Sequence, residues 1–155
     1  MIVTKDARWK PNVTVAGIAE QAGRFLLIEE HTSDGLLLNQ PAGHLEDGET
    51  LVEAVCREVL EETACGFTPE ALIGVYQWRE PARGRTFMRF SFAGSVSAPV
   101  ADLKLDAGIE RALWMTRDEI AAAAGRFRSP WVLVSIDDYL AGRRMPLDLI
   151  RSIHS

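Results

Sequence analysis

The stretch GHLEDGETLVEAVCREVLEETACG, residues 43–66, decides how this chain folds. Its second part predicts a helix over residues 50–63, because this segment contains neither proline nor glycine and follows the turn pair Asp47-Gly48. At about 100° per residue, one face of that helix is apolar. The face comprises Leu51, Val52, Val55, Cys56, Val59 and Leu60. We therefore expect the helix to pack this face against the rest of the protein.

The same helix carries three glutamates, Glu58, Glu61 and Glu62, at positions i, i+3 and i+4. Like charges at this spacing destabilise a helix by about 0.2–0.5 kcal/mol per pair, and carboxylates that border an apolar face are poorly solvated. A divalent cation removes both costs, since Mg²⁺ and Mn²⁺ prefer carboxylate oxygens. Taken alone, however, such a pattern is more often a solvated helix face.

Three more residues stand at fixed distances from these glutamates: Gly43, then Glu49 after five residues, then Arg57 after a further seven. The spacing matches the Nudix box, Gly-x5-Glu-x7-Arg-Glu-U-x-Glu-Glu-x-Gly-U, where U is a bulky apolar residue. Six fixed residues at about 7% usage each coincide on the order of 10⁻⁷ per window, so chance is negligible. The chain is identified on this motif as a member of the Nudix family. It departs from the box at Ala64, which replaces a glycine, and we expect Gly66 to end the helix instead.

The resemblance implies a reaction and a role for each box residue. Nudix enzymes hydrolyse a phosphoanhydride with divalent metal held by the box helix, so Mg²⁺ is expected, with Mn²⁺ as a substitute. The metal ligands of the family correspond to Glu58, Glu61, Glu62 and the backbone carbonyl of Ala42. Glu58 would be either a ligand or the base that takes a proton from the attacking water. Arg57 and Glu49 would pair with each other and orient the carboxylates for catalysis.

Segments outside the box extend the resemblance to the NudJ-type phosphatases, a subgroup of the family. These segments are residues 40–46, 77–78, 89–90, 127–130 and 142–147. Similarity to this subgroup implies release of terminal phosphate from nucleoside tri- and diphosphates. It also suggests a hydroxymethylpyrimidine diphosphate of the thiamine pathway as a substrate.

Residues 76–90 supply the candidates for substrate binding, because they hold four arginines and one glutamate in an otherwise acidic protein. Within this segment we assign Trp78 and Arg89 to the substrate, since a base can stack on tryptophan while arginines hold phosphates. Arg128 is added on family resemblance alone. An ordinary hairpin with solvated arginines is an equally weighted alternative.

Three residues near these motifs have weaker claims. Glu110 precedes Trp114, where many Nudix enzymes have an extra acidic ligand or base, but a plain surface glutamate is the simpler interpretation. His44 lies in the box loop, and an ordinary hydrogen bond is expected there rather than substrate contact. Cys56 falls on the apolar helix face, which predicts a core thiol rather than a nucleophile.

The rest of the chain predicts strands before and after this helix. We expect a hairpin of residues 13–19 with 25–29, strands at 36–38, 72–78, 86–96 and 113–115, and a loop at 40–44. Helices are expected at 118–124 and from Ser129-Pro130 to about residue 140, with Ser129 as the cap. This order indicates the α/β (α+β) class, and the resemblance implies the Nudix fold, a mixed central sheet sandwiched between helices.

Composition limits the functions that fit. With 155 residues, 47% of them hydrophobic, the chain is expected to be a single domain over residues 1–155 with a core at about 11–141. A net charge of −5 argues against nucleic acid as a partner, and no apolar run reaches the length of about 18–20 residues that spans a membrane. Two cysteines and no export signal indicate the cytoplasm. We expect a monomer that acts on a small-molecule pyrophosphate.

Two alternatives stay open on the sequence alone. A Nudix pyrophosphohydrolase of a sugar nucleotide, a dinucleoside polyphosphate or 8-oxo-dGTP would carry the same box, because the box handles only the shared diphosphate. A nucleotide-sensing Nudix module without catalysis is the second alternative. The presence of all three box glutamates argues against it.

Overall fold

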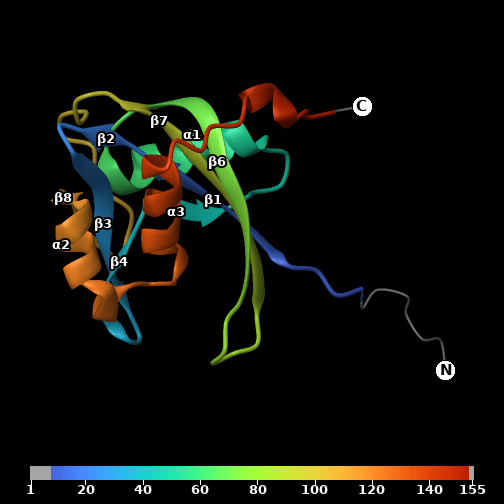
Figure 1. The fold of residues 1–155 in the computed structure, drawn as a ribbon, viewed down its shortest axis with the longest axis horizontal. Coiled ribbons are helices and arrows are strands. Elements are labelled where there is room, and N and C mark those ends of the chain that lie inside the picture. Colours follow the sequence, from blue (N-terminus) through green and yellow to red (C-terminus); the bar gives the residue numbers. More distant parts are fainter. Residues whose placement is uncertain (1–7, 154–155) are drawn as a thin grey trace.

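Two four-stranded sheets and three α-helices make up the fold over residues 8–153, the part that the computed structural model describes (Figure 1). The first sheet has the order β5-β1-β7-β6 and is mixed, since β1 and β7 are parallel and the other pairs are antiparallel. In the second sheet, β3 pairs antiparallel with β2, β4 and β8. The expected α/β class with a mixed sheet between helices is confirmed.

The elements have the following bounds. The strands are β1 Asn12–Ile18, β2 Glu20–Gln21, β3 Arg24–Thr32, β4 Gly35–Asn39, β5 Ala42–His44, β6 Phe67–Arg79, β7 Thr86–Val96 and β8 Ile109–Thr116. The helices are α1 Leu51–Thr63, α2 Arg117–Ala122 and α3 Trp131–Leu140, with short 3₁₀ turns at Ala124–Arg126 and Leu147–Leu149. No helix within residues 8–153 is both long enough and apolar enough to cross a membrane. The expectation about an export signal concerns residues 1–7 in part, and these lie outside the described residues.

Helix α1 begins at a capping box. The Thr50 side chain accepts from the Glu53 N–H at 3.1 Å, and the Glu53 carboxylate accepts from the Thr50 N–H at 2.8 Å. The helix ends at Ala64, which has left-handed backbone angles, φ 62° and ψ 10°. The expectation that Gly66 ends the helix is therefore wrong. Gly66 already exchanges hydrogen bonds with Ser97 beside the β6–β7 ladder, so the reversal has to occur two residues earlier.

Two hydrophobic cores lie on opposite faces of the mixed sheet. Helix α1 covers one core, which contains Val15, Ala54, Val55, Val59, Phe67, Leu72 and Phe92. Helices α2 and α3 cover the other, which contains Ile18, Phe25, Leu27, Leu38, Ile73, Ala93, Ile120, Trp131, Val132 and Ile136. Leu72 and Ile73 are neighbours in the chain but belong to different cores, as the two-residue period of a strand requires. The mixed sheet is thus buried on both faces.

Three local expectations are corrected. Strand β1 pairs with β5 and β7 instead of β3, so the hairpin consists only of the strand ends around the turn at Ala22-Gly23. A two-residue turn fixes the pairing of the residues beside it and says nothing of the strand beyond. Within the predicted loop 40–44, residues 42–44 form β5. Ser129 does not cap α3 with its side chain: Pro130 already has helical angles, and among residues 8–153 the Ser129 hydroxyl has no hydrogen-bond partner.

Candidate active site

Arg57 is the centre of a charged network on α1. Its guanidinium donates to both oxygens of Glu49, to Glu58 Oε1 at 2.8 Å and to Glu61 Oε2 at 3.2 Å. It also donates to the backbone carbonyl of His44 at 3.0 Å, which ties the helix to β5. These bonds, chiefly that to Glu49, raise the pKa of Arg57, while Arg57 lowers the pKa of Glu49. Glu49 and Arg57 are brought together, as expected from the box.

Gly43 lies directly against the carboxylate of Glu58. A Cβ atom at position 43 would overlap all three atoms of that carboxylate group, which is buried. Because Gly43 is in the middle of β5 and pairs with Val15, the strand cannot move away without breaking the ladder. The first and fourth fixed positions of the box are therefore in contact, and glycine is required here by lack of space.

The buried carboxylate of Glu62 accepts one hydrogen bond in this structure, from the Ala42 N–H to Oε2 at 3.0 Å. Burial raises the pKa of Glu62 to about 9, with the Ala42 bond opposing the shift. Burial also raises the pKa of Glu58, although Arg57 opposes it. Both shifts show that the negative charge here is incompletely neutralised by the protein.

The donor set fits a hard divalent cation. Glu58 and Glu61 each accept from Arg57 with one oxygen. In the part of the chain that the structure describes, the other oxygen of each, and the second oxygen of Glu62, accept no hydrogen bond. Carboxylate and carbonyl oxygens are what Mg²⁺ and Mn²⁺ take as ligands. Within residues 8–153, no three acidic, histidine or cysteine side chains are gathered as a metal cluster, and Arg57 bonds to two of the box glutamates.

Two acidic residues that the sequence analysis missed act on these glutamates. The charge of Asp106 raises the pKa values of Glu58 and Glu62, and that of Glu30 adds to the rise at Glu62. The Asp106 N–H also donates to the Glu61 carbonyl at 3.0 Å. Asp106 lies in the loop before β8, the kind of position at which many Nudix enzymes were expected to have an extra acidic residue. Glu110, for which a plain surface glutamate was the simpler interpretation, lies on β8, is exposed and pairs with His31 at 2.7 Å.

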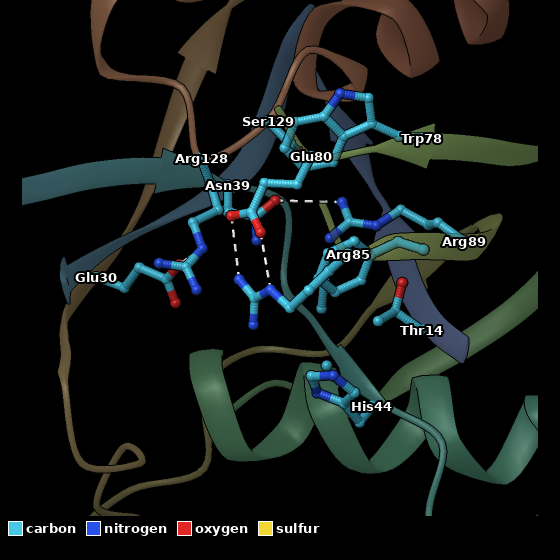
Figure 2. A pocket seen from close by; sticks show the side chains of 13 residues that line it. Thr14, Glu30, Asn39, His44, Trp78, Glu80, Arg85, Arg89, Arg128 and Ser129 are labelled. Atoms are coloured by element: carbon cyan, nitrogen blue, oxygen red, sulfur yellow. Dashed lines mark hydrogen bonds and ion pairs between the residues drawn. The ribbon is translucent and has the colours of Figure 1, made fainter. Parts of the chain in front are cut away.

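A cavity of about 200 Å³ opens beside the box residues (Figure 2). It is lined by Thr14, Glu30, Asn39, Ala42, Gly43, His44, Trp78, Glu80, Arg85, Phe87, Arg89, Arg128 and Ser129. Strand register explains part of this set, because Arg89 on β7, Thr14 on β1 and His44 on β5 are direct neighbours across the mixed sheet. The three expected substrate residues, Trp78, Arg89 and Arg128, thus line one cavity together with Ala42 of the box segment.

The aromatic wall of the cavity is built by packing between β6, β7 and α3. Trp78 and Phe87 are stacked at 6.1 Å between ring centroids, and Trp131 meets Trp78 edge-on at 5.2 Å. The guanidinium of Arg89 lies 4.4 Å from the centroid of Trp131 and is 4% exposed. Burial lowers the pKa of Arg89, but a guanidinium remains protonated at neutral pH.

The two remaining candidates, Cys56 and His44, differ in their surroundings. Cys56 is half-buried beside the α1 core, and its thiol donates to the Phe67 carbonyl at 3.4 Å. Burial raises its pKa, as expected for a core thiol. The hydrogen bond expected for the His44 side chain is absent among residues 8–153; the exposed ring instead lines the cavity, 6.4 Å from that of Phe87.

The comparisons with known proteins agree with this geometry. The NUDIX domain profile matches residues 8–133. The chain is 42% identical over 142 residues to phosphatase NudJ of Escherichia coli strain K12, which covers 92% of each chain. A solved NUDIX hydrolase from Nitrosomonas europaea superposes with a TM-score of 0.91 at 49% identity, covering 93% of this chain and 98% of that one. A UDP-X diphosphatase structure, at 17% identity and a TM-score of 0.72 over 90% of this chain and 68% of that one, shares the fold.

Proposed function

Because the chain belongs to the Nudix family of hydrolases that act on phosphoanhydrides, we propose that it is a magnesium-dependent, NudJ-like phosphatase of small pyrophosphates. Its substrates in this proposal are nucleoside tri- and diphosphates and a hydroxymethylpyrimidine diphosphate, from which it releases terminal phosphate. The likeness to phosphatase NudJ over 92% of both chains supports this choice within the family.

In this proposal Glu58, Glu61, Glu62 and the carbonyl of Ala42 hold the metal, Mg²⁺ or in its place Mn²⁺. When bound, the metal neutralises the diphosphate oxygens and lowers the pKa of a coordinated water. With the oxygen that Arg57 leaves free, Glu58 fills one of two roles, metal ligand or base that takes the proton from the attacking water. Glu49 holds Arg57, which fixes the direction of the carboxylates.

One observation supports the proposal most directly. The Glu58 carboxylate lies against Gly43, which itself lines the cavity that holds the proposed substrate-binding residues. Glu58 and the cavity therefore share the Ala42–His44 strand as a common wall. A group bound beside Trp78 and Arg89 has its phosphates within reach of the box helix. A protein that only sensed nucleotides would need no such arrangement of a buried carboxylate.

The test is phosphate release with Mg²⁺ from GTP, GDP, the pyrimidine diphosphate, ADP-ribose and diadenosine polyphosphate, with and without added pyrophosphatase. Direct release of phosphate from the first three substrates is the expected result. Signal only after pyrophosphatase is added would mean cleavage at the inner phosphorus and would replace the proposal by a pyrophosphohydrolase. No release from any compound, with Mg²⁺ binding intact, would favour a sensing module.

A further inference from the structure

Arg89 differs from the other two arginines of the cavity in having no carboxylate partner. Arg85 is held by Glu80 at 2.8 and 3.0 Å, and Arg128 is paired with Glu30 at 3.1 Å. Among residues 8–153, Arg89 forms no ion pair, and its single hydrogen bond runs from Nη1 to Asn39 Oδ1 at 3.2 Å. Figure 2 shows Arg89 and Asn39 at the back of the cavity and the Glu80–Arg85 pair in front of them.

The buried guanidinium of Arg89 has two neutral neighbours, Asn39 and the Trp131 ring, and the charges of Glu62 and Glu30 act on it without forming an ion pair within residues 8–153. The Arg89 side chain is almost fully buried, and its Nε has no hydrogen-bond partner in the part of the chain that the structure describes. Removing a charge from water without a directly bonded counter-ion is unfavourable, so such groups in native proteins are paired or face a ligand. The position of Arg89 beside the cavity points to a ligand.

Two hydroxyl groups of the same cavity are also without partners. Thr14 Oγ1 and Ser129 Oγ are both buried and make no hydrogen bond in the described structure. Thr14 is the direct neighbour of Arg89 in the parallel β1–β7 ladder, and Ser129 enters from the segment before α3. More than about 90% of buried polar groups in proteins have a partner, so three exceptions at one cavity call for a common explanation.

We propose that Arg89, Thr14 and Ser129 form an oxyanion subsite for the substrate phosphate that leaves as inorganic phosphate. Phosphate offers the negative charge that Arg89 lacks and several acceptor oxygens for the planar guanidinium and the hydroxyls. The neutral ring of a substrate would not compensate the charge of Arg89. That ring has a stacking surface elsewhere in the cavity, on Trp78 and Phe87. Asn39 acts as a positioning residue that holds Nη1. The role as a leaving-group site rests on the proposed phosphatase function; the binding of phosphate itself does not.

The direct test is calorimetric titration of inorganic phosphate into the full-length protein with Mg²⁺ present. We expect Arg89→Gln to weaken phosphate binding at least tenfold, and Thr14→Val and Ser129→Ala to weaken it about two- to fivefold. Arg85→Gln is the matched control, because it removes the same charge from the same cavity at a position that Glu80 already neutralises. Its phosphate affinity should stay within twofold of the parent.

Thermal melting gives a second, independent readout. Thr14→Val and Ser129→Ala remove hydroxyls that have no partner, so the free variants should melt at the same temperature as the parent or above it. Weaker phosphate binding together with unchanged or higher stability is the signature of a ligand site. These two variants also carry the test if Arg89→Gln does not fold.

Unchanged phosphate affinity in all three variants, or an equal loss in Arg85→Gln, would overturn the subsite. The proposed function is tested separately by the products of hydrolysis. If the protein releases no phosphate from any substrate but binds phosphate through Arg89, the proposed subsite stands and the proposed function is wrong. If the protein releases phosphate but Arg89→Gln leaves its phosphate affinity unchanged, the proposed function stands and the proposed subsite is wrong.

Discussion

Ala64 holds a backbone conformation that glycine adopts far more readily than alanine. It has φ 62° at the end of α1, at the position where the box has glycine. A left-handed conformation costs an L-residue about 1–2 kcal/mol, and glycine avoids this cost although it loses more chain entropy on folding. The departure from the box at this position therefore reduces stability and leaves the carboxylates in place.

We predict that Ala64→Gly raises the free energy of unfolding by about 1 kcal/mol and leaves kcat unchanged. Urea denaturation measures the first quantity and phosphate release the second. Ala121→Gly is the control, since Ala121 lies within α2, where the same exchange should lower stability by about 0.5–1 kcal/mol. A loss of stability in Ala64→Gly would show that the left-handed geometry carries no strain.

Glu58 is the residue on which turnover should depend most. It is buried, it faces Gly43, and one of its oxygens is held by Arg57. Glu58→Gln keeps the shape of the side chain and removes its basicity, so we expect kcat to fall by about 10²–10⁴-fold with Mn²⁺ binding still measurable by calorimetry. Turnover near that of the parent protein would remove Glu58 from the role of base.

At the scale of elements, the contact between β5 and α1 is as important as any single side chain. Gly43→Ala places a Cβ atom where the Glu58 carboxylate lies, while the ladder to β1 holds the strand in position. We predict a loss of about 1–3 kcal/mol of stability and of most of the activity. Circular-dichroism melts and phosphate release measure the two effects.

The double variant Gly43→Ala with Glu58→Ala separates packing from chemistry. Removing the Glu58 carboxylate leaves room for the new Cβ, so the two changes should be non-additive and stability should return toward that of Glu58→Ala alone. Activity should stay absent in the double variant. Additive losses would mean that Gly43 is needed for another reason than space.

Across the whole molecule, the features that could be predicted from sequence are those that depend on near neighbours in the chain. The helix at residues 50–63 agrees with α1 to within one residue, because its apolar period and the turn pair before it are local signals. The predicted partner of residues 13–19 was wrong, because alternation of apolar and polar residues predicts a strand but not which strand pairs with it. Trp78, Arg89 and Arg128 were assigned to the substrate, yet nothing in the sequence showed that Arg89 alone would be buried without a carboxylate.

The same limit applies to the carboxylates around the box helix. Asp106 and Glu30 act on Glu62 from a loop after β7 and from β3, and their sequence positions follow no fixed spacing from the box. Only the fold brings these negative charges together, on a protein with a net charge of −5. The consequence is a metal-free state whose stability depends on pH.

The direction of that dependence follows from the pKa of Glu62, which burial raises to about 9 in the folded protein from 4.5. Below the unfolded value both states hold the proton, and the contribution to stability is complete. As pH rises toward 9, only the unfolded state releases its proton, so each such group lowers the free energy of unfolding by up to about 1.4 kcal/mol per pH unit. Glu58, whose pKa is also raised, acts in the same direction.

We therefore predict that the protein in EDTA melts at a lower temperature at pH 8.5 than at pH 6, and that Mg²⁺ raises the melting temperature more at pH 8.5. A cation bound to ionised carboxylates stabilises the state that high pH favours, so metal and pH are linked. Differential scanning calorimetry at both pH values measures the effect. Glu62→Gln should flatten the slope in EDTA, whereas Glu70→Gln, at an exposed position on β6, should leave it as it is. A metal-free protein that is equally stable at both pH values would mean that Glu62 is ionised in the folded state without metal.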